Sequence, residues 1–343
     1  MWLAAPTTST TTSILGAHMR IGQNPAKYQK EVAKPERITV AVLNYLPFLS
    51  GFYADGLEVL KVCLESLREG ADLPNDLLVF DNGSCEEARQ YLLDEHQAGR
   101  IQFLLFSEKN VGKGGAWNMI LAGSPGEIIA YTDSDAYFYK GWLSRSVQLL
   151  ETFPKVGMVT ARPFRTKEEF YSQTVQWGET TPGVSVEHGQ FITYETFREF
   201  DLSLGQSEVE IKQHYETTED VRLMYNGVQA IAGASHWQFV AYKSILQQFL
   251  PFSMDRPMGQ VRQLDQRMNE AGYLRLMITD PLAMNMSNTL RNAPGQAAQR
   301  AVNRATSIRA ARLLDFPPIR RALLSLYDVI FRWYYDRQSD RAS

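Results

Sequence analysis

The sequence has few cysteines and no long apolar run. Its 343 residues contain only Cys63 and Cys85, so the fold does not depend on a disulfide framework. No apolar stretch is long enough to span a bilayer. The first residues are rich in Ser and Thr, and they lack the basic and apolar regions of a secretory signal. We therefore expect a protein of the reducing cytoplasm that is not an integral membrane protein.

An excess of positive charge over the whole chain is also missing. The net charge is -3 and charged residues make up 21% of the chain, which gives no reason to expect nucleic acid as a partner. Hydrophobic residues reach 44%, enough for the core of one large domain or two ordinary ones. The charge is uneven, because residues 291–343 contain ten Arg, no Lys and four Asp.

What is present is an alternation of short apolar runs and helical patterns. The continuous run at 38–43 is typical of a parallel strand covered on both faces, and the leucines between 57 and 67 recur at helical spacing. Further strands are predicted at 77–80, 101–106, 128–131 and 156–160, with Leu274 to Ile278 as the last one. This alternation predicts a doubly wound α/β sheet flanked by helices.

The chain divides into three parts. Residues 1–36 read as a flexible N-terminal lead-in, and 37–290 as the α/β domain, with a first half at 37–165 and a second half at 166–290. Within the second half, the segment from Lys167 to Tyr225 has little periodicity, so it is either a long functional loop or a small subdomain. We expect residues 291–343 to be a basic, helical C-terminal extension.

Polar residues follow several predicted strands where each one ends. In such sheets ligands bind beyond the carboxyl ends of the strands. Asp133 and Asp135 are the most informative pair, since two carboxylates one residue apart suit Mg²⁺ or Mn²⁺, which share oxygen ligands with substrate phosphates. Taken alone, the Asp-Ser-Asp triplet could be an ordinary turn. The other strand-end residues are Asn44, Tyr45, Asp81, Asn82, Asn110 and Ser134.

These motifs, in this order, resemble the family 2 glycosyltransferases of the GT-A fold over residues 37–288. The resemblance rests on Asn44-Tyr45, Asp81 to Ser84, the Gly-rich stretch Asn110 to Asn118, Asp133-Ser134-Asp135 and the stretch Asp265 to Tyr273. It implies an inverting transfer of a sugar from a nucleotide diphosphate sugar, UDP- or dTDP-linked, to a glycan, lipid-linked or protein acceptor.

The resemblance also implies roles for single residues around the donor. Asp135 would be the metal ligand, and Asp133 would contact ribose or metal. The remaining nucleotide-sugar contacts would come from Asn44, Tyr45, Asp81, Asn82, Asn110, Gly112, Lys113, Gly114, Asn118 and Ser134. Many relatives hold the metal with a further His, where this chain has Asn285 or Asn288, and His236 is an alternative.

Inversion needs a general base, which in the family is a carboxylate near the acceptor. Asp265 is the first candidate, but it lies only two residues before Arg267, so Asp255 is a rival. On the acceptor side the resemblance and the residue types suggest His236, Trp237 and Gln238, with Trp177 as a weaker candidate of the same kind.

The C-terminal stretch from Arg320 to Tyr335 predicts a basic amphipathic helix. Such a helix could lie on the inner face of an anionic membrane or pack against the catalytic domain or a second subunit. Two other functions stay open for the whole chain. One is a catalytically impaired sugar-nucleotide-binding module, and the other is a nucleotidyltransferase, although that class opens with a basic Gly-rich loop after its first strand.

Overall fold

The computed structural model describes residues 23–28, 30–255 and 261–290. The chain falls into two compact units, residues 1–35 and 36–343. In the described part of the first unit, Pro25–Tyr28 form a 3-10 helix. The predicted helix at 320–335 lies outside the described residues. Within the described ranges, no helix has both the length and the apolar character needed to cross a membrane.

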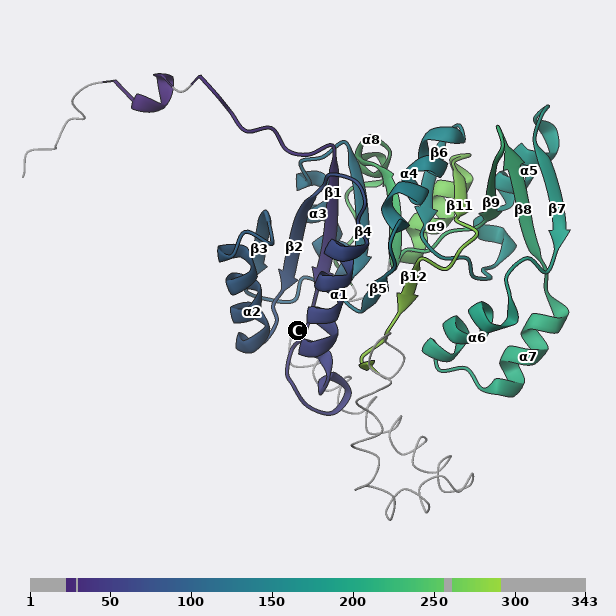
Figure 1. Cartoon of the computed structure of the whole chain (residues 1–343), viewed down its shortest axis with the longest axis horizontal. Helices are drawn as coiled ribbons and strands as arrows, with labels where there is room; N and C mark the ends of the chain where they lie inside the picture. Colours follow the sequence, from purple (N-terminus) through teal and green to yellow (C-terminus); the bar gives the residue numbers. More distant parts are fainter. Residues whose placement is uncertain (1–22, 29, 256–260, 291–343) are drawn as a thin grey trace, which may run out of the picture. The chain divides into compact units, whose positions relative to one another are not determined.

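The second unit is built on one mixed sheet of ten strands (Figure 1). Across the sheet, the strands follow the order β3-β2-β1-β4-β10-β6-β11-β9-β8-β7. Their bounds are β1 Ile38–Asn44, β2 Asp76–Asn82, β3 Phe103–Ser107, β4 Ile128–Asp133, β6 Val156–Thr160, β7 Ser185–Gly189, β8 Asp220–Tyr225, β9 Val228–Ala232, β10 Gln238–Tyr242 and β11 Leu274–Met277.

Strand directions divide the sheet. β3, β2, β1 and β4 are parallel, with Val42 opposite Val79 on one side and Thr132 on the other. β10 runs antiparallel to both β4 and β6, and β7, β8 and β9 form an antiparallel meander at the far edge. All seven residues of β1 are buried, as its unbroken apolar run predicts.

Helices cover both faces of the sheet. On one face Val40 and Val42 pack with Leu60 and Leu64 of α1, and on the other Ala41 packs in the cluster that contains Trp117 of α3. Figure 1 shows α1 and α4 on the same side of the strands. The helices are α1 Gly56–Gly70, α2 Glu86–Gln97, α3 Gly112–Gly123, α4 Trp142–Thr152, α5 Ser172–Thr180, α6 Tyr194–Ser203, α7 Glu208–Thr217, α8 Lys243–Leu246 and α9 Val261–Glu270, with short 3-10 turns at Gly51–Tyr53, Glu168–Phe170 and Gln247–Phe249.

The segment after Lys167 is a subdomain rather than a loop. It contains α5, α6 and α7, and its strands β7 and β8 extend the sheet. A buried ion pair holds it together, since Nε of Arg165 lies 2.7 Å from Oδ1 of Asp220. The other oxygen of Asp220 accepts the backbone N–H groups of Phe191 and Ile192 at 2.9 Å. Its irregular sequence pattern follows from these short elements, which no single periodicity spans.

The prediction that the strand near Leu274 is the last one was wrong. A further short strand, β12 (Ala283–Asn285), pairs antiparallel with β5 (Ala136–Phe138), next to the main sheet. At three residues it is too short to show an alternating pattern. Its place matters because the register puts Asn285 opposite Ala136, immediately after Asp135.

Candidate functional site

Asn44 and Asp81 form a buried hydrogen-bonded frame at the ends of β1 and β2. Nδ2 of Asn44 donates to Oδ1 of Asp81 at 2.9 Å and to Oγ of Ser84 at 3.0 Å. The other oxygen of Asp81 accepts the backbone N–H of Ser84 at 3.1 Å. Tyr45, the next residue after β1, is 38% exposed. The frame fixes where the two strands end, while ligand contacts by these residues stay predictions.

A second amide pair fixes the Gly-rich turn. Nδ2 of Asn82 donates to Oδ1 of Asn110 at 2.9 Å, and Oδ1 of Asn82 accepts the backbone N–H of Val111 at the same distance. Oδ1 of Asn110 also accepts the N–H of Gly112 at 2.8 Å. These bonds tie the end of β2 to the start of α3, so the helix N-terminus lies beside the strand ends.

Gly83 is the tightest point of this arrangement. Its φ is +81°, and a Cβ there would lie 2.9 Å from the backbone N of Asn110 and the backbone carbonyl carbon of Lys109. We expect Gly83→Ala to lower the free energy of unfolding by about 2–4 kcal/mol, through backbone strain and the clash together. Gly99→Ala is the matched control, because Gly99 has φ +74° but open space around it. We expect this variant to lower the free energy of unfolding by about 1 kcal/mol. Equal losses in urea unfolding would show that the close approach contributes nothing.

The start of α3 packs tightly against residues 252–254. A Cβ on Gly114 would lie 2.6 Å from the carbonyl oxygen of Ser253, so only glycine fits there. Asn118 uses both ends of its amide on the backbone of Phe252, donating to its carbonyl at 2.8 Å and accepting its N–H at 2.7 Å. Asn118 therefore holds this segment against the helix, and its contact with a nucleotide stays a prediction.

Both carboxylate oxygens of Asp133 are engaged. Nζ of Lys113, a side chain only 7% exposed, lies 2.6 Å from Oδ2, and the hydroxyl of Tyr131 donates to Oδ1 at 2.6 Å. Burial and the neighbouring Asp133 raise the pKa of Tyr131 well above its ordinary value, so the phenol keeps its proton. Ser134 is held by its backbone N–H, which donates to the carbonyl of Leu43 at 3.1 Å.

Asp135 is in a different environment from Asp133. It forms no salt bridge with any residue that the structure describes. Burial, and then the negative charge of Asp133, raise the pKa of Asp135 to about 7, while Lys113 acts in the opposite direction. The backbone carbonyl of Asp135 accepts the N–H of Met286 at 2.8 Å, which fixes it beside β12.

A divalent cation fits this donor set. Among the described residues, no three His, Cys, Asp or Glu side chains are grouped to hold a metal on their own. Mg²⁺ and Mn²⁺, however, are commonly bound by one or two carboxylates, with phosphate and water completing the shell. Burial and the charge of Asp133 disfavour the ionised form of Asp135 and raise its pKa, and a bound cation would stabilise that form. Asn285 is the neighbouring neutral donor, although its Oδ1 accepts the N–H of Ser287 at 2.7 Å.

The pKa of Asp135 predicts how stability depends on pH in metal-free buffer. Because its pKa is about 7 in the folded protein and about 3.8 in the unfolded chain, ionisation opposes folding. The resulting loss of stability is absent below pH 4, grows as pH rises, and is complete above pH 7. We expect it to reach about 2 kcal/mol after solvent screening. Urea unfolding of the protein and of Asp135→Asn between pH 4 and 8, in EDTA, measures it, and identical pH profiles would contradict the prediction.

His236, Asp265 and Arg275 form a chain beside the acidic strand end. Nδ1 of His236 lies 2.7 Å from Oδ2 of Asp265, and Oδ1 of Asp265 pairs with the guanidinium of Arg275. The Asp265 side chain is 7% exposed and that of Arg275 1%, whereas His236 is 29% exposed. Burial lowers the pKa of Arg275, and the charge of Asp265 opposes this shift only in part.

The residues after His236 are mostly structural in their contacts. The backbone carbonyl of Trp237 accepts the N–H of Asp133 at 2.9 Å, and its indole stacks on Phe200 at 6.1 Å. Gln238 is fully buried, and its Oε1 accepts the N–H of Ala161 at 2.7 Å. Of these three predicted acceptor residues, His236 is therefore the most exposed side chain.

Two predicted residues have their contacts elsewhere. Trp177 lies on α5, where its ring packs against Phe153 and Tyr225 at 5.9 and 5.4 Å. Asp255 is exposed and directly precedes residues 256–260, which lie outside the described part. The site roles of both residues stay predictions.

Sequence reasoning missed two residues of the site. Tyr131 is fully buried in β4 and donates to Asp133, and Arg275 is fully buried in β11 and pairs with Asp265. Each had a signal in the sequence, namely a polar group inside an otherwise apolar strand. A lone Arg in a buried strand requires a partner, and that requirement points to a nearby carboxylate.

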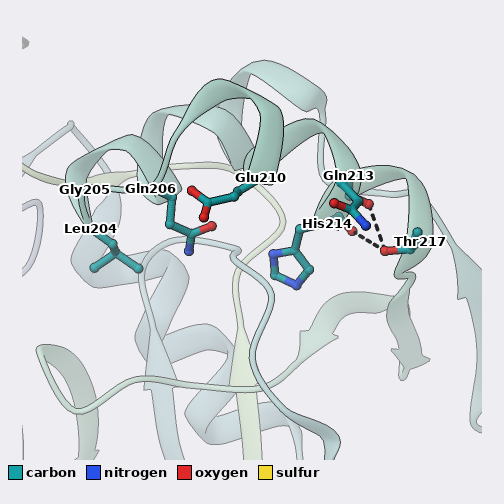
Figure 2. A pocket seen from close by; sticks show the side chains of 7 residues that line it. All are labelled: Leu204, Gly205, Gln206, Glu210, Gln213, His214 and Thr217. Atoms are coloured by element: carbon teal, nitrogen blue, oxygen red, sulfur yellow. Dashed lines mark hydrogen bonds between the residues drawn. The ribbon is translucent and has the colours of Figure 1, made fainter. Parts of the chain in front are cut away.

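A separate hollow of about 550 Å³ lies on α6 and α7 (Figure 2). It is lined by Leu204, Gly205, Gln206, Glu210, Gln213, His214 and Thr217. The ring of His214 is positioned by Asp201, since Oδ2 of Asp201 lies 3.3 Å from Nδ1 of His214. Burial raises the pKa of Asp201, and His214 opposes that shift. None of the predicted site residues lines this hollow.

A mixed α/β sheet with helices on both faces, a Gly-rich helix start and an acidic strand end together define a domain of the nucleotide-binding α/β class. The family model described as "Glycosyl transferase family 2" matches residues 52–203. Residues 52–203 are thus similar to glycosyl transferase family 2, the family that the motifs resemble.

Known proteins similar to this chain cover only part of it. An uncharacterized glycosyltransferase from Nostoc sp. is 26% identical over 84 residues, which are 24% of this chain and 26% of that protein. Residues 1–349 of TarS from S. aureus align with 72% of this chain and 59% of that structure at 14% identity and a TM-score of 0.42. The mannosyltransferase PcManGT from Pyrobaculum calidifontis, solved with GDP-Man and Mn²⁺, aligns with 73% of this chain and 56% of that structure, at 17% identity and a TM-score of 0.43. The chain thus spans about a quarter of the curated relative and less than two thirds of these two structures.

Proposed function

We propose that this protein transfers a sugar from a nucleotide diphosphate sugar to an acceptor hydroxyl, with inversion at the anomeric carbon. The observation that carries the proposal is the different state of the two aspartates at the end of β4. Asp133 forms a salt bridge with Lys113 of α3, whereas Asp135 forms no salt bridge with a described residue, and burial and Asp133 raise its pKa. An anionic ligand alone would be repelled by Asp135. A ligand that brings a divalent cation with it would be attracted.

The proposed chemistry follows from where negative charge develops. When the bond between the anomeric carbon and the diphosphate breaks, the leaving group gains negative charge, which positive groups nearby stabilise. A bound Mg²⁺ or Mn²⁺ would supply most of that stabilisation, with Asp135 as its protein ligand and Asn285 as a neutral neighbour. Lys113 would keep Asp133 in place and add a positive charge near the phosphates.

The acceptor hydroxyl must lose its proton to a general base on the opposite face of the sugar. The sequence offers the carboxylates Asp265 and Asp255 for that task. The acceptor itself, whether a glycan, a lipid-linked sugar or a protein, would approach from the side of His236 and Trp237. A reducing compartment suits the two cysteines, both of which are free thiols.

A thermal-shift titration tests the proposal. The purified full-length chain is melted with UDP, dTDP, GDP and CDP, each with Mn²⁺ and with EDTA. A ligand that binds the native state raises the melting temperature by mass action. We expect a shift with one nucleoside diphosphate that requires Mn²⁺. A shift of equal size in EDTA would contradict the metal site and favour a binding module, and no shift with any nucleotide would contradict the proposed function.

A further inference from the structure

We propose that His236 is the general base of the transfer and that Asp265 is its positioning residue, an inference that rests on the proposed function. The sequence suggested Asp265 itself as the base. The geometry favours the imidazole instead, because of how the two side chains are partnered and exposed.

Asp265 is poorly placed to take a proton from an acceptor. Its two oxygens are each engaged, Oδ1 by the guanidinium of Arg275 and Oδ2 by Nδ1 of His236. Its side chain is only 7% exposed. An acceptor hydroxyl would have to displace one of these partners, and displacing Arg275 would leave a buried cation without its carboxylate. The carboxylate therefore acts best through its neighbour.

His236 has the properties that Asp265 lacks. Its side chain is 29% exposed, and Nε2 has no hydrogen-bond partner within the described ranges. Because Nδ1 faces a carboxylate, the neutral ring carries its proton on Nδ1 and its lone pair on Nε2, which is the form that a base requires. After Nε2 takes a proton, the imidazolium is stabilised by the same carboxylate.

The backbone places His236 at the edge where the donor is expected. β10 pairs antiparallel with β4, with Gln238 opposite Thr132, and the carbonyl of Trp237 accepts the N–H of Asp133 at 2.9 Å. His236 directly precedes Trp237 in the bend before β10, so its backbone lies next to the residue that bonds Asp133 at the end of β4. Arg275 is in turn anchored by the carbonyl of Ala234 at 2.6 Å, which fixes the loop that carries the ring.

The proposed step balances in protons and electrons. The acceptor oxygen forms a bond to the anomeric carbon as its proton passes to Nε2 of His236. The bond from that carbon to the diphosphate oxygen breaks, and the nucleoside diphosphate leaves with the electron pair. The imidazolium later returns the proton to water. With no acceptor present, water can take the place of the hydroxyl, which gives a measurable release of nucleoside diphosphate.

The test compares His236→Ala with the unmodified full-length chain, using as probe the UDP-, dTDP-, GDP- or CDP-linked sugar whose nucleoside diphosphate shifts the melt. We expect kcat for nucleoside diphosphate release to fall by about 10²–10⁴-fold while KM changes by less than about threefold. The donor-induced thermal shift should be kept, and added imidazole should restore part of the rate. His96→Ala is the matched control. His96 lies near the end of α2, and among the described residues its ring is hydrogen-bonded to the carbonyl of Ile101. This variant should neither lose rate nor respond to imidazole.

Three outcomes would overturn the inference: an unchanged rate in His236→Ala, a loss that imidazole does not restore, and a loss of the thermal shift together with the rate. For the positioning role, Asp265→Asn should lower kcat by about 10²-fold with KM kept, and an unchanged kcat would contradict that role. Failure of the proposed function looks different, because the unmodified protein would then show neither a nucleotide shift nor any release.

Discussion

Asp135→Asn is expected to lower the rate of nucleoside diphosphate release by about 10³-fold or more, because it removes the negatively charged protein ligand of the proposed cation. Asn keeps the shape of the side chain and an oxygen, so the fold should survive. The same variant should be as stable as the unmodified chain at pH 4 and more stable at pH 8 without metal, since burial and Asp133 raise the pKa of the carboxyl that it replaces. Loss of activity with gain of stability is the mark of a residue retained for chemistry.

The measurement is the rate of release at saturating donor over a range of Mn²⁺ concentrations. Asp72→Asn is a suitable control, because Asp72 is an exposed carboxylate that accepts hydrogen bonds from Ser144 on α4. We expect the control to keep its rate and its dependence on Mn²⁺. If Asp135→Asn released nucleoside diphosphate at the rate of the unmodified chain, Asp135 would not be the principal ligand. The same would follow if high Mn²⁺ fully restored the rate of the variant.

Asp265→Ala should lower the free energy of unfolding by about 3–5 kcal/mol, because it leaves the buried guanidinium of Arg275 without its carboxylate. Arg275 is 1% exposed and also donates to the carbonyls of Ala234 and Phe170, so it cannot reach water without breaking those bonds. Urea or thermal unfolding measures the loss. This effect would be separate from any effect on turnover.

Two further variants separate a lost charge pair from a lost contact. The double variant Asp265→Ala with Arg275→Met should recover much of the stability, because no charge is then left uncompensated. Asp280→Ala removes the carboxylate of an exposed pair with Arg145, where both side chains are about half exposed, and should cost less than about 1 kcal/mol. A double variant as unstable as Asp265→Ala would mean that packing, and not charge, determines the loss.

The strand ends of the first half could be predicted from the sequence. Their apolar runs are long and regular, and the polar residues that follow them, such as Asn44 and Asp81, come to one edge because parallel strands end together. The family motif is also local, so the Gly-rich turn and the two aspartates were recognisable without any knowledge of the fold.

The partners of those residues could not be predicted. Whether a carboxylate is paired depends on residues far along the chain, as with Lys113 and Asp133, or Asp265 and Arg275. Residue type alone does not distinguish Asp133 from Asp135, yet of the two only Asp133 pairs with Lys113. The order of the strands was equally hidden, because β10 returns from the second half to lie beside β4, and short antiparallel strands leave no periodic signal.

The insertion of β10 between β4 and β6 has a consequence for the synthesis of the protein. The ribosome delivers β4 and β6 long before the residues of β10, so the growing chain has a gap at the centre of its sheet. Until Tyr242 has emerged, the edge of β4 is unpaired and open to wrong partners. Until Trp237 has been synthesised, the backbone N–H of Asp133 also lacks the carbonyl to which it donates in the folded protein. The end of β4 that carries Asp133 should therefore reach its final structure only after the second half of the chain has been synthesised.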